Sequence, residues 1–241
     1  NGDARADIVW RRSSDGATYL WTLDGLVPTG FFSLGALSPL NWSFVGAADL
    51  NGDGKADLIW RSTSGIIYGW LMNGDEISSQ GVISYIDPPW SIADLADMNG
   101  DGKADLVFRH SVSGEVYVWN MNGLAVTGMG SAGSLDPAIW ELVAAADFDV
   151  DGKADLLWRH ASGDTWVSLM NGTTTLASAS IGNPGQGWSI VSVADLDGVG
   201  RSGIVWRHTD GTSYFWRMNG LFVTGFVPLP DPGSDWRGTV R

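Results

Sequence analysis

Acidic and amide side chains alternate with other residues in a loop at residues 49–57, DLNGDGKAD. Positions 1, 3, 5 and 9 of this loop offer side-chain oxygens, and the backbone carbonyl of position 7 can join them. Calcium takes about six to eight hard oxygen ligands at flexible distances, and glycine at position 6 permits the sharp turn. The spacing therefore predicts a calcium site with five ligand residues: Asp49, Asn51, Asp53, Lys55 and Asp57. Only the carbonyl of the lysine would bind, and its side chain would point outward.

Two further loops repeat the same spacing of oxygen-bearing residues. Their predicted ligands are Asp97, Asn99, Asp101, Lys103 and Asp105 in one loop, and Asp147, Asp149, Asp151, Lys153 and Asp155 in the other. An EF-hand would need glutamate at the last position of a longer loop. The three loops have aromatic residues there, Trp60, Phe108 and Trp158, so they do not match an EF-hand.

Two more copies of the loop lack part of the ligand set. One copy keeps Asp195 and Asp197 but has Val199 and Gly203 at two ligand positions. The other, at residues 1–7, begins inside the motif and lacks its first aspartate. We expect calcium to occupy the three complete loops well and these two poorly or not at all.

The five loops belong to a repeat of 48 to 50 residues that fills the chain, with units at about 1–50, 51–98, 99–148, 149–196 and 197–241. Each unit contains short segments of alternating or continuous apolar residues, which predict strands. In the second unit these segments lie at residues 42–50, 56–62, 66–72 and 76–84. Asn73-Gly74 separates the last two and is typical of a tight type I′ hairpin turn.

Four antiparallel strands in each unit, repeated along the whole chain, are typical of a β-propeller, with a linear solenoid as the alternative. The first unit lacks an opening strand, and the sequence after Asp235 offers a surplus strand that begins at Trp236. We therefore predict one all-β domain over residues 1–241, a five-bladed β-propeller of four-stranded antiparallel blades. Its C-terminal strand would pair with the strand near Ala6, which would close the ring and protect the edge strands.

Large aromatic residues and arginines recur at fixed places in the repeat. Nearly all of the 14 tryptophans lie in the first strand, at the end of the second or in the third, and we interpret them mainly as packing between blades. An arginine follows the second-strand aromatic residue in every unit, and a histidine follows that arginine in three units. With a nearby aromatic residue, these side chains are candidates for repeated ligand pockets between blades: Arg109, His110, Arg159, His160, Arg207 and His208. The alternative is that each arginine binds carbonyl or carboxylate groups within its own blade.

The composition argues against several classes of protein. Acidic residues outnumber basic ones by 27 to 14, and the net charge of −13 would repel phosphate backbones, so we expect no nucleic-acid partner. The absence of cysteine excludes a disulfide framework and a thiol nucleophile. No apolar stretch is long enough to predict a membrane span, and no basic-then-apolar signal segment opens the sequence.

The sequence resembles the FG-GAP or VCBS-type repeat. The resemblance rests on the strand, loop and strand of AADLNGDGKADLIWR and AADFDVDGKADLLWR, and on the following WNMNG at residues 119–123. It covers the entire chain. Related repeats build the calcium-containing propeller heads of integrin α chains and several sugar-binding propeller lectins. The resemblance therefore implies a propeller, calcium in the loops and a secreted or cell-surface location, and it does not fix the ligand.

These features predict a non-catalytic, calcium-stabilised binding module. Five similar pockets with aromatic and polar groups suit weak ligands bound with avidity, so a multivalent carbohydrate-binding, lectin-like propeller is the first hypothesis. A protein-interaction or cell-surface structural module is the alternative. A polysaccharide-acting enzyme is a third hypothesis, although the sequence has neither a G-x-S-x-G nor an H-E-x-x-H motif. The expected partner is a glycan or a protein, and a monomer is compatible with the sequence.

Overall fold

The computed structural model describes residues 1–3 and 5–230. These residues form 19 β-strands in five antiparallel sheets, which we call blades 1 to 5 in chain order. Blade 1 contains β1 (Ile8–Arg11), β2 (Ala17–Asp24) and β3 (Val27–Ala36). Blade 2 contains β4 (Trp42–Ala48), β5 (Asp57–Ser62), β6 (Ile66–Asn73) and β7 (Glu76–Tyr85). Within the described part of the chain there is no helix, and hence none that could cross a membrane.

The remaining blades repeat the four-stranded pattern. Blade 3 contains β8 (Trp90–Ala96), β9 (Asp105–His110), β10 (Glu115–Asn122) and β11 (Ala125–Ser134). Blade 4 contains β12 (Trp140–Ala146), β13 (Asp155–His160), β14 (Thr165–Asn171) and β15 (Thr174–Gly182). Blade 5 contains β16 (Trp188–Ala194), β17 (Gly203–His208), β18 (Ser213–Asn219) and β19 (Phe222–Leu229).

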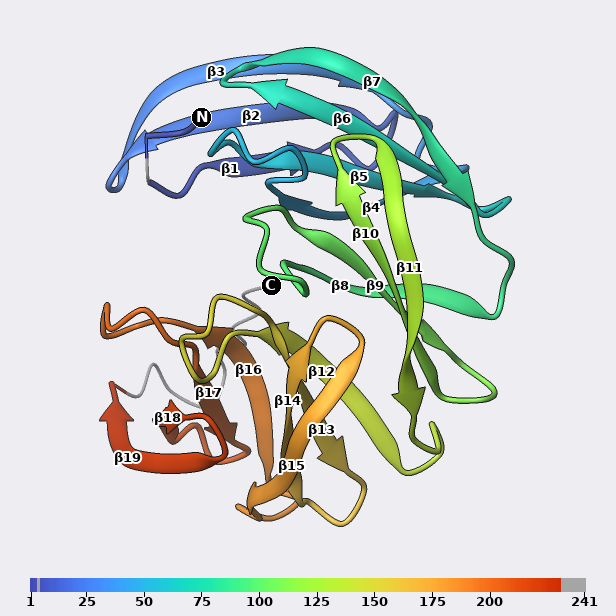
Figure 1. Ribbon diagram of the computed structural model, residues 1–241. Coiled ribbons are helices and arrows are strands. Elements are labelled where there is room, and N and C mark those ends of the chain that lie inside the picture. Colours follow the sequence, from blue (N-terminus) through green and yellow to red (C-terminus); the bar gives the residue numbers. More distant parts are fainter. Residues whose placement is uncertain (4, 231–241) are drawn as a thin grey trace.

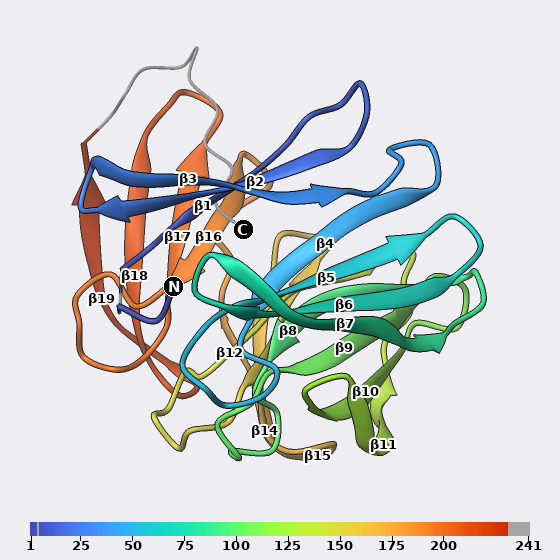
Figure 2. The same ribbon diagram turned by 90° about the horizontal axis from the view of Figure 1, so that it is seen from above.

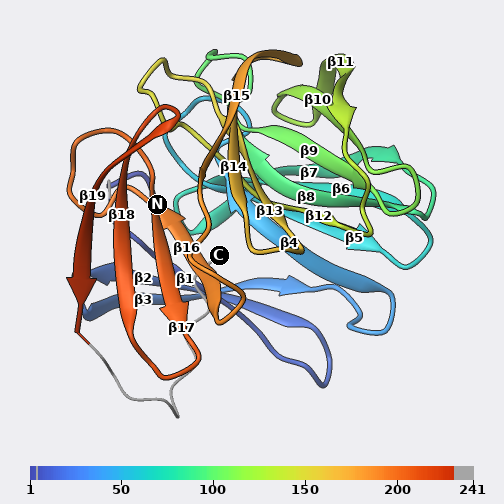
Figure 3. The same ribbon diagram turned by 90° about the horizontal axis from the view of Figure 1, so that it is seen from below.

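The blades follow one another in chain order. Within each of blades 2 to 5 the strands are hydrogen-bonded in sequence order, and β4, β8, β12 and β16 contact one another from blade to blade. Figure 1 shows blades 1 and 2 at the top, blade 3 at the right, and blades 4 and 5 at the bottom. Figures 2 and 3 show the four strands of blade 5 side by side, from β16 to β19. This arrangement confirms the predicted five-bladed propeller.

Strands and turns fall where the local sequence predicts them. The second unit has its strands at β4 to β7, within three residues of the predicted limits. The Asn73-Gly74 turn joins β6 to β7, and Gly74 has a φ of +71°, in the left-handed region that glycine adopts without a Cβ penalty. The predicted hairpin is therefore confirmed.

The hydrophobic core lies between adjacent blades. Between blades 1 and 2, Leu20 and Leu34 pack with Leu58, Trp60 and Trp70. Comparable clusters join blades 2 and 3, 3 and 4, and 4 and 5. Large aromatic side chains bury roughly 150 to 250 Å² each, so they supply much of the stabilising apolar surface. Each blade thus depends on its neighbours for a buried face.

The first blade has three strands among the described residues. Trp10 is 48% exposed, whereas its counterparts Trp60 and Trp206 are fully buried. The strand predicted to complete this blade, at residues 236–241, lies outside the described residues. Ring closure by that strand therefore stays a prediction.

Candidate metal loops and an inter-blade cavity

Each repeated loop joins the first and second strands of a blade, and its first aspartate fixes its shape. In blade 2 the carboxylate of Asp49 accepts the N–H groups of Gly52 and Gly54, both at 2.7 Å. Asp97 makes the same two bonds in blade 3, and Asp147 makes equivalent bonds in blade 4. These hydrogen bonds help to fix the conformation of the three loops.

Three carboxylates converge in the loop of blade 4. Oxygens of Asp147, Asp149 and Asp151 all lie within 4.8 Å of one another. Two oxygens on opposite sides of a calcium ion lie about 5 Å apart, so all three can reach one ion. The donor set fits calcium, and the carbonyl of Lys153 is the predicted further ligand. In blades 2 and 3 an amide stands in place of the second carboxylate, at Asn51 and Asn99.

The last aspartate of each loop is buried and connects the loop to the third strand. The carboxylate of Asp57 accepts the N–H of Leu50 at 3.0 Å and that of Met72 at 2.8 Å. Asp105 and Asp155 make the same pair of bonds in their own blades. Each carboxylate oxygen has a second lone pair, so these bonds are compatible with the predicted role in calcium binding.

Burial changes the acidity of these three carboxyl groups. It raises the pKa of Asp57 and of Asp105 to about 6, and that of Asp155 to about 7, although the two N–H bonds act in the opposite direction. Neighbouring loop carboxylates raise the pKa further, because like charges disfavour ionisation. A bound cation would favour the ionised form.

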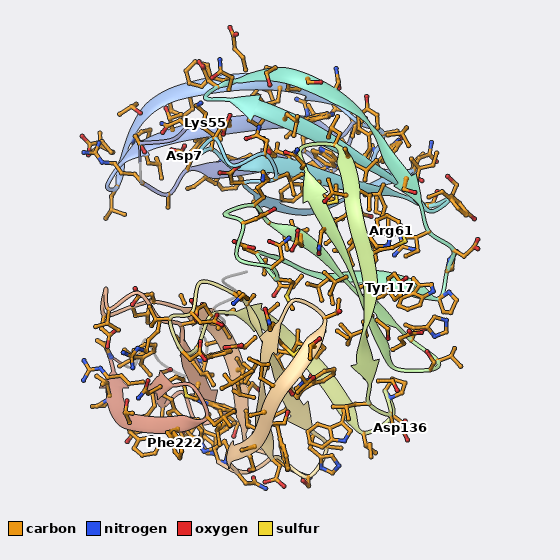
Figure 4. The ribbon with its side chains drawn as sticks, viewed as in Figure 1. Asp7, Lys55, Arg61, Tyr117, Asp136 and Phe222 are labelled. Carbon is orange, nitrogen blue, oxygen red and sulfur yellow. The ribbon has the colours of Figure 1, made fainter. Side chains whose placement is uncertain are left out.

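The lysine at position 7 does not point outward, and that expectation is wrong. The Nζ of Lys153 lies 3.3 Å from Asp151 Oδ2, and Lys103 and Lys55 lie near the equivalent carboxylates at 3.4 and 3.6 Å. The physical reason is twofold: the ammonium group approaches the negative loop, and the aliphatic stem packs on a neighbouring loop. A Cβ added to Gly52 would lie 3.4 Å from Cγ of Lys103. A Cβ added to Gly2 would lie 3.0 Å from Cγ of Lys55, the lysine labelled in Figure 4.

Backbone hydrogen bonds connect each loop to the next blade. The carbonyl oxygens of Asp49 and Asp97 each accept an N–H from the following loop, of Ala104 and of Ala154, at 2.7 Å. The carbonyl of Asp147 accepts the N–H of Ser202 at 2.8 Å. The three loops therefore contribute to the contacts between blades, and a metal ion that orders a loop would also support the neighbouring blade.

The two incomplete loops keep only part of the arrangement seen in the complete loops. Asp197 accepts a hydrogen bond from Arg217 Nε at 2.7 Å. Gly203 stands where the buried aspartate would be, and a Cβ there would clash with the Phe215 ring at 2.3 Å. In blade 1, Asp7 accepts the N–H of Leu23 at 3.0 Å, as Asp57 accepts that of Met72 in blade 2. Weak or absent metal binding at these loops stays a prediction.

The repeated arginines contact carbonyl oxygens and the tryptophan of the following blade. Arg109 donates to the carbonyls of Gly114 and Leu135, the second at 2.6 Å, and its guanidinium carbon lies 4.8 Å from the centroid of Trp158. Arg159 makes corresponding contacts with blade 5, and Arg207 donates to Ser213 Oγ at 3.4 Å. Two of these arginines thus join blades, rather than binding within one blade alone.

The three histidines lie at the other end of the blades from the metal loops. His110, His160 and His208 each pair across strands with the first-strand tryptophan, with ring centroids 4.7, 4.6 and 4.9 Å apart. Successive residues of a strand point to opposite faces. The arginine and the histidine of one unit therefore face different neighbours and cannot line the same pocket, and a ligand role for any of them stays a prediction.

A cavity of about 400 Å³ lies between blades 3 and 4. Blade 4 contributes three tryptophans and several hydroxyl groups, and the end of β11 forms the other wall: Trp140, Leu156, Trp158, Trp166, Ser168, Thr175, Ser178, and residues 132–135. Asp136, labelled in Figure 4, follows Leu135 in the link from β11 to β12. None of the predicted arginines or histidines lines this cavity.

Sequence reasoning missed this cavity, although a signal was present. Trp166 occupies a place that tyrosine holds in the other units, and Ser168 occupies the place of the third-strand tryptophan. The missing tryptophan at position 168 is therefore the sequence signal for this cavity.

The FG-GAP-like repeat matches the sequence four times, at residues 1–60, 49–108, 97–158 and 147–206. These matches together span most of the chain and include all three complete acidic loops. No curated protein matches the chain.

Several solved structures share the fold at low sequence identity. Chaetomium thermophilum Raptor superimposes with a TM-score of 0.53 at 14% identity over 93% of this chain and 20% of its own. The C-terminal WD40 domain of Sif2 gives 0.51 at 12% identity, covering 93% and 69%. BBS1N, solved in complex with ARL6DN, gives 0.50 at 12% identity, covering 95% and 63%. The chain thus spans less than two thirds of the Raptor and BBS1N chains, and these likenesses show the fold alone.

Proposed function

This chain belongs to the FG-GAP-like repeat family, and we propose that it is a calcium-stabilised, non-catalytic module that binds carbohydrate. The family and the propeller fold support a binding or interaction module. The finer assignment rests on one observation, the uncharged cavity between blades 3 and 4, which is lined by tryptophans and hydroxyl groups.

Calcium is supported by the chemistry of the loops. The carboxylates of Asp147, Asp149 and Asp151 lie close enough together to share one ion. Without a cation, the repulsion between these negative charges at such short range would be unfavourable. A divalent cation would offset part of the net charge of −13. Extracellular modules bind calcium with Kd values of about 10⁻⁴ to 10⁻³ M, so a secreted or cell-surface location accords with sites of modest affinity in these loops.

A carbohydrate ligand is supported by the kinds of side chain in the cavity. Flat indole faces can cover the apolar C–H face of a sugar ring, and hydroxyl groups can donate to and accept from its own hydroxyls. The cavity volume of about 400 Å³ lies at the small end of the range for ligand pockets, roughly 300 to 1,000 Å³. The lining includes no charged side chain.

The non-catalytic assignment is supported by the positions of the perturbed carboxyl groups. Asp57, Asp105 and Asp155 have raised pKa values, which in an enzyme would make them candidates for proton transfer. Each is buried, and each binds two backbone N–H groups. They are therefore structural, and a substrate on the surface does not reach them.

A protein partner is the second candidate, favoured by apolar side chains on the outer strands. Phe31, Met129 and Phe226 are 62 to 63% exposed, and each lies opposite a third-strand tryptophan. Phe222, labelled at the edge of blade 5 in Figure 4, is 71% exposed. Such residues can contribute to a protein interface.

A glycan array distinguishes the two candidates. The chain is applied once with calcium and once with a chelator, and we expect glycan binding with calcium that weakens when the metal is removed. A blank array in both conditions would favour the protein partner. Retention of binding in the chelator, with no change in melting temperature, would contradict the calcium part of the proposal.

A further inference from the structure

We propose that the cavity between blades 3 and 4 is the single glycan site of this chain, and that it exists because Ser168 replaces a tryptophan. This inference rests on the proposed carbohydrate-binding function and deepens it. It replaces the expectation of five equivalent pockets with one site that differs from the other blade interfaces.

The strand register shows the replacement. In blades 1, 2, 3 and 5, a tryptophan pairs with the neighbouring strand at equivalent places, opposite Ile8, Leu58, Leu106 and Ile204. These tryptophans are Trp21, Trp70, Trp119 and Trp216. In blade 4 the residue opposite Leu156 is Ser168. Each of those tryptophans packs against a second-strand aromatic ring, with centroids 4.6 to 5.0 Å apart. Trp158 has no such indole beside it at position 168.

The outer strand carries a matching replacement. The fourth-strand residues opposite the tryptophans are larger side chains: Phe31, Gln80, Met129 and Phe226. Opposite Ser168 is Ser178, and the two hydroxyl groups form a hydrogen bond. Blade 4 therefore has two small hydroxyl side chains where the other blades have two large ones. Loss of that bulk leaves space, and the serines give it polar groups.

The walls around this space are held in place. Trp158 is 4% exposed, and the guanidinium group of Arg109 lies over its ring. Arg109 also donates to the carbonyl of Leu135 in the opposite wall at 2.6 Å. Trp140 and Trp166 meet edge to face, with centroids 6.0 Å apart. Arg109 is thus a positioning residue that connects both walls, whereas the tryptophans and serines face the ligand space.

The chemistry of the lining selects a neutral, hydroxylated ring. Aromatic rings favour an apolar ring face, and Ser168, Thr175 and Ser178 favour hydroxyl partners. The cavity lining offers no opposite charge to a carboxylate, and moving an unpaired charge out of water is costly. We therefore expect neutral hexoses, 6-deoxyhexoses or N-acetylhexosamines to bind, and uronic or sialic acids to bind poorly.

The test uses the full chain with calcium and a panel of methyl glycosides of those sugars. Titration calorimetry and tryptophan fluorescence would report binding, and we expect one ligand per chain. Ser168→Trp restores the side chain of the other blades and should abolish binding while calcium binding and the melting temperature are retained. Ser168→Ala keeps the space and removes one hydroxyl, so affinity should fall by roughly two- to tenfold, as for one lost hydrogen bond.

Blade 2 offers a matched control at the equivalent position of its outer strand, Gln80, which pairs with Trp70. Gln80→Ser makes the change in the outer strand that blade 4 has, without removing Trp70, and should leave affinity and stoichiometry unchanged. Undiminished binding by Ser168→Trp, or several equivalent ligands per chain, would overturn the single-site inference while the carbohydrate function stands. If the wild-type chain binds none of the panel and no arrayed glycan, the proposed carbohydrate function fails, and the site with it.

Discussion

Asp155 accepts the backbone N–H of Met170 at 2.9 Å and so joins the acidic loop of blade 4 to its third strand. The other oxygen of the same carboxylate accepts the N–H of Phe148 at 3.0 Å. One buried side chain therefore satisfies two backbone donors from different segments. The repeat of this arrangement at Asp57 and Asp105 indicates that the last loop aspartate has a structural role whether or not it also binds calcium.

The first prediction concerns Asp155→Asn. An amide presents one oxygen and one NH₂ group, so one of the two N–H donors would lose its acceptor and face another donor. The cost should be about 1 to 3 kcal/mol, the range for a buried group left without a partner. Denaturant unfolding in chelator measures it without a metal contribution. The control is Asp151→Asn in the same loop, which should cost clearly less because that side chain is more exposed; equal losses would contradict the structural role.

The second prediction is a pH dependence of metal-free stability. The folded-state pKa of Asp57, Asp105 and Asp155 is raised by burial to about 6, 6 and 7, above the ordinary value of 3.8. Between those values the folded state binds more protons than the unfolded state, so the free energy of unfolding falls as pH rises. We expect chelated protein to be more stable at pH 5 than at pH 7.5.

Calcium should weaken or reverse that trend, because it favours the ionised carboxylates. Thermal unfolding at both pH values, with chelator and with calcium, gives the four required measurements. Asp155→Asn should show a smaller dependence in chelator, since one titrating group is gone. Metal-free stability that rises from pH 5 to pH 7.5 would show that these carboxyl groups do not dominate the titration.

The sequence predicted the parts of the structure that local patterns determine. The strands, the Asn-Gly hairpins and the acidic loops follow from short motifs repeated five times, and repetition made each motif easier to recognise. The lysine orientation was wrong because it depends on a second loop, where Gly52 leaves space for the stem of Lys103. The two hydrogen bonds that Asp57 accepts from the N–H groups of Leu50 and Met72 were not predicted, since Met72 belongs to another strand.

The sequence indicates which blade interface lacks a tryptophan, although it does not determine whether a cavity remains there. When TWVSLMN of blade 4 is aligned with EVYVWNMN of blade 3 on the shared Met-Asn, Ser168 occupies the position equivalent to Trp119. Whether a missing indole leaves a cavity or is compensated by collapse depends on the neighbouring blade, which the sequence does not place. The structure shows that space is retained beside Trp158.

The third prediction is the number of calcium ions. Calcium calorimetry should detect three sites, in the loops of blades 2 to 4, and chelation should lower the melting temperature. Each site stabilises by about 2.7 kcal/mol when calcium exceeds its Kd roughly a hundredfold. Asp149→Ala should remove one site. Asp197→Ala is the matched control at the same loop position of blade 5, and it should leave the stoichiometry unchanged; a lost ion in that variant would place calcium in a loop expected to lack it.

The last prediction concerns Lys153, whose ammonium group lies 3.3 Å from Asp151 Oδ2. A calcium ion and this ammonium group compete for the same negative charge, so Lys153→Met should raise the calcium affinity of the blade 4 loop while retaining the aliphatic stem. Metal-free stability should fall by at most about 1 kcal/mol, because a partly exposed ion pair contributes little. Calcium titration of Lys153→Met, compared with Lys153→Arg as the charge-retaining control, separates charge from packing. Equal affinities in the two variants would show that the lysine charge does not regulate metal binding.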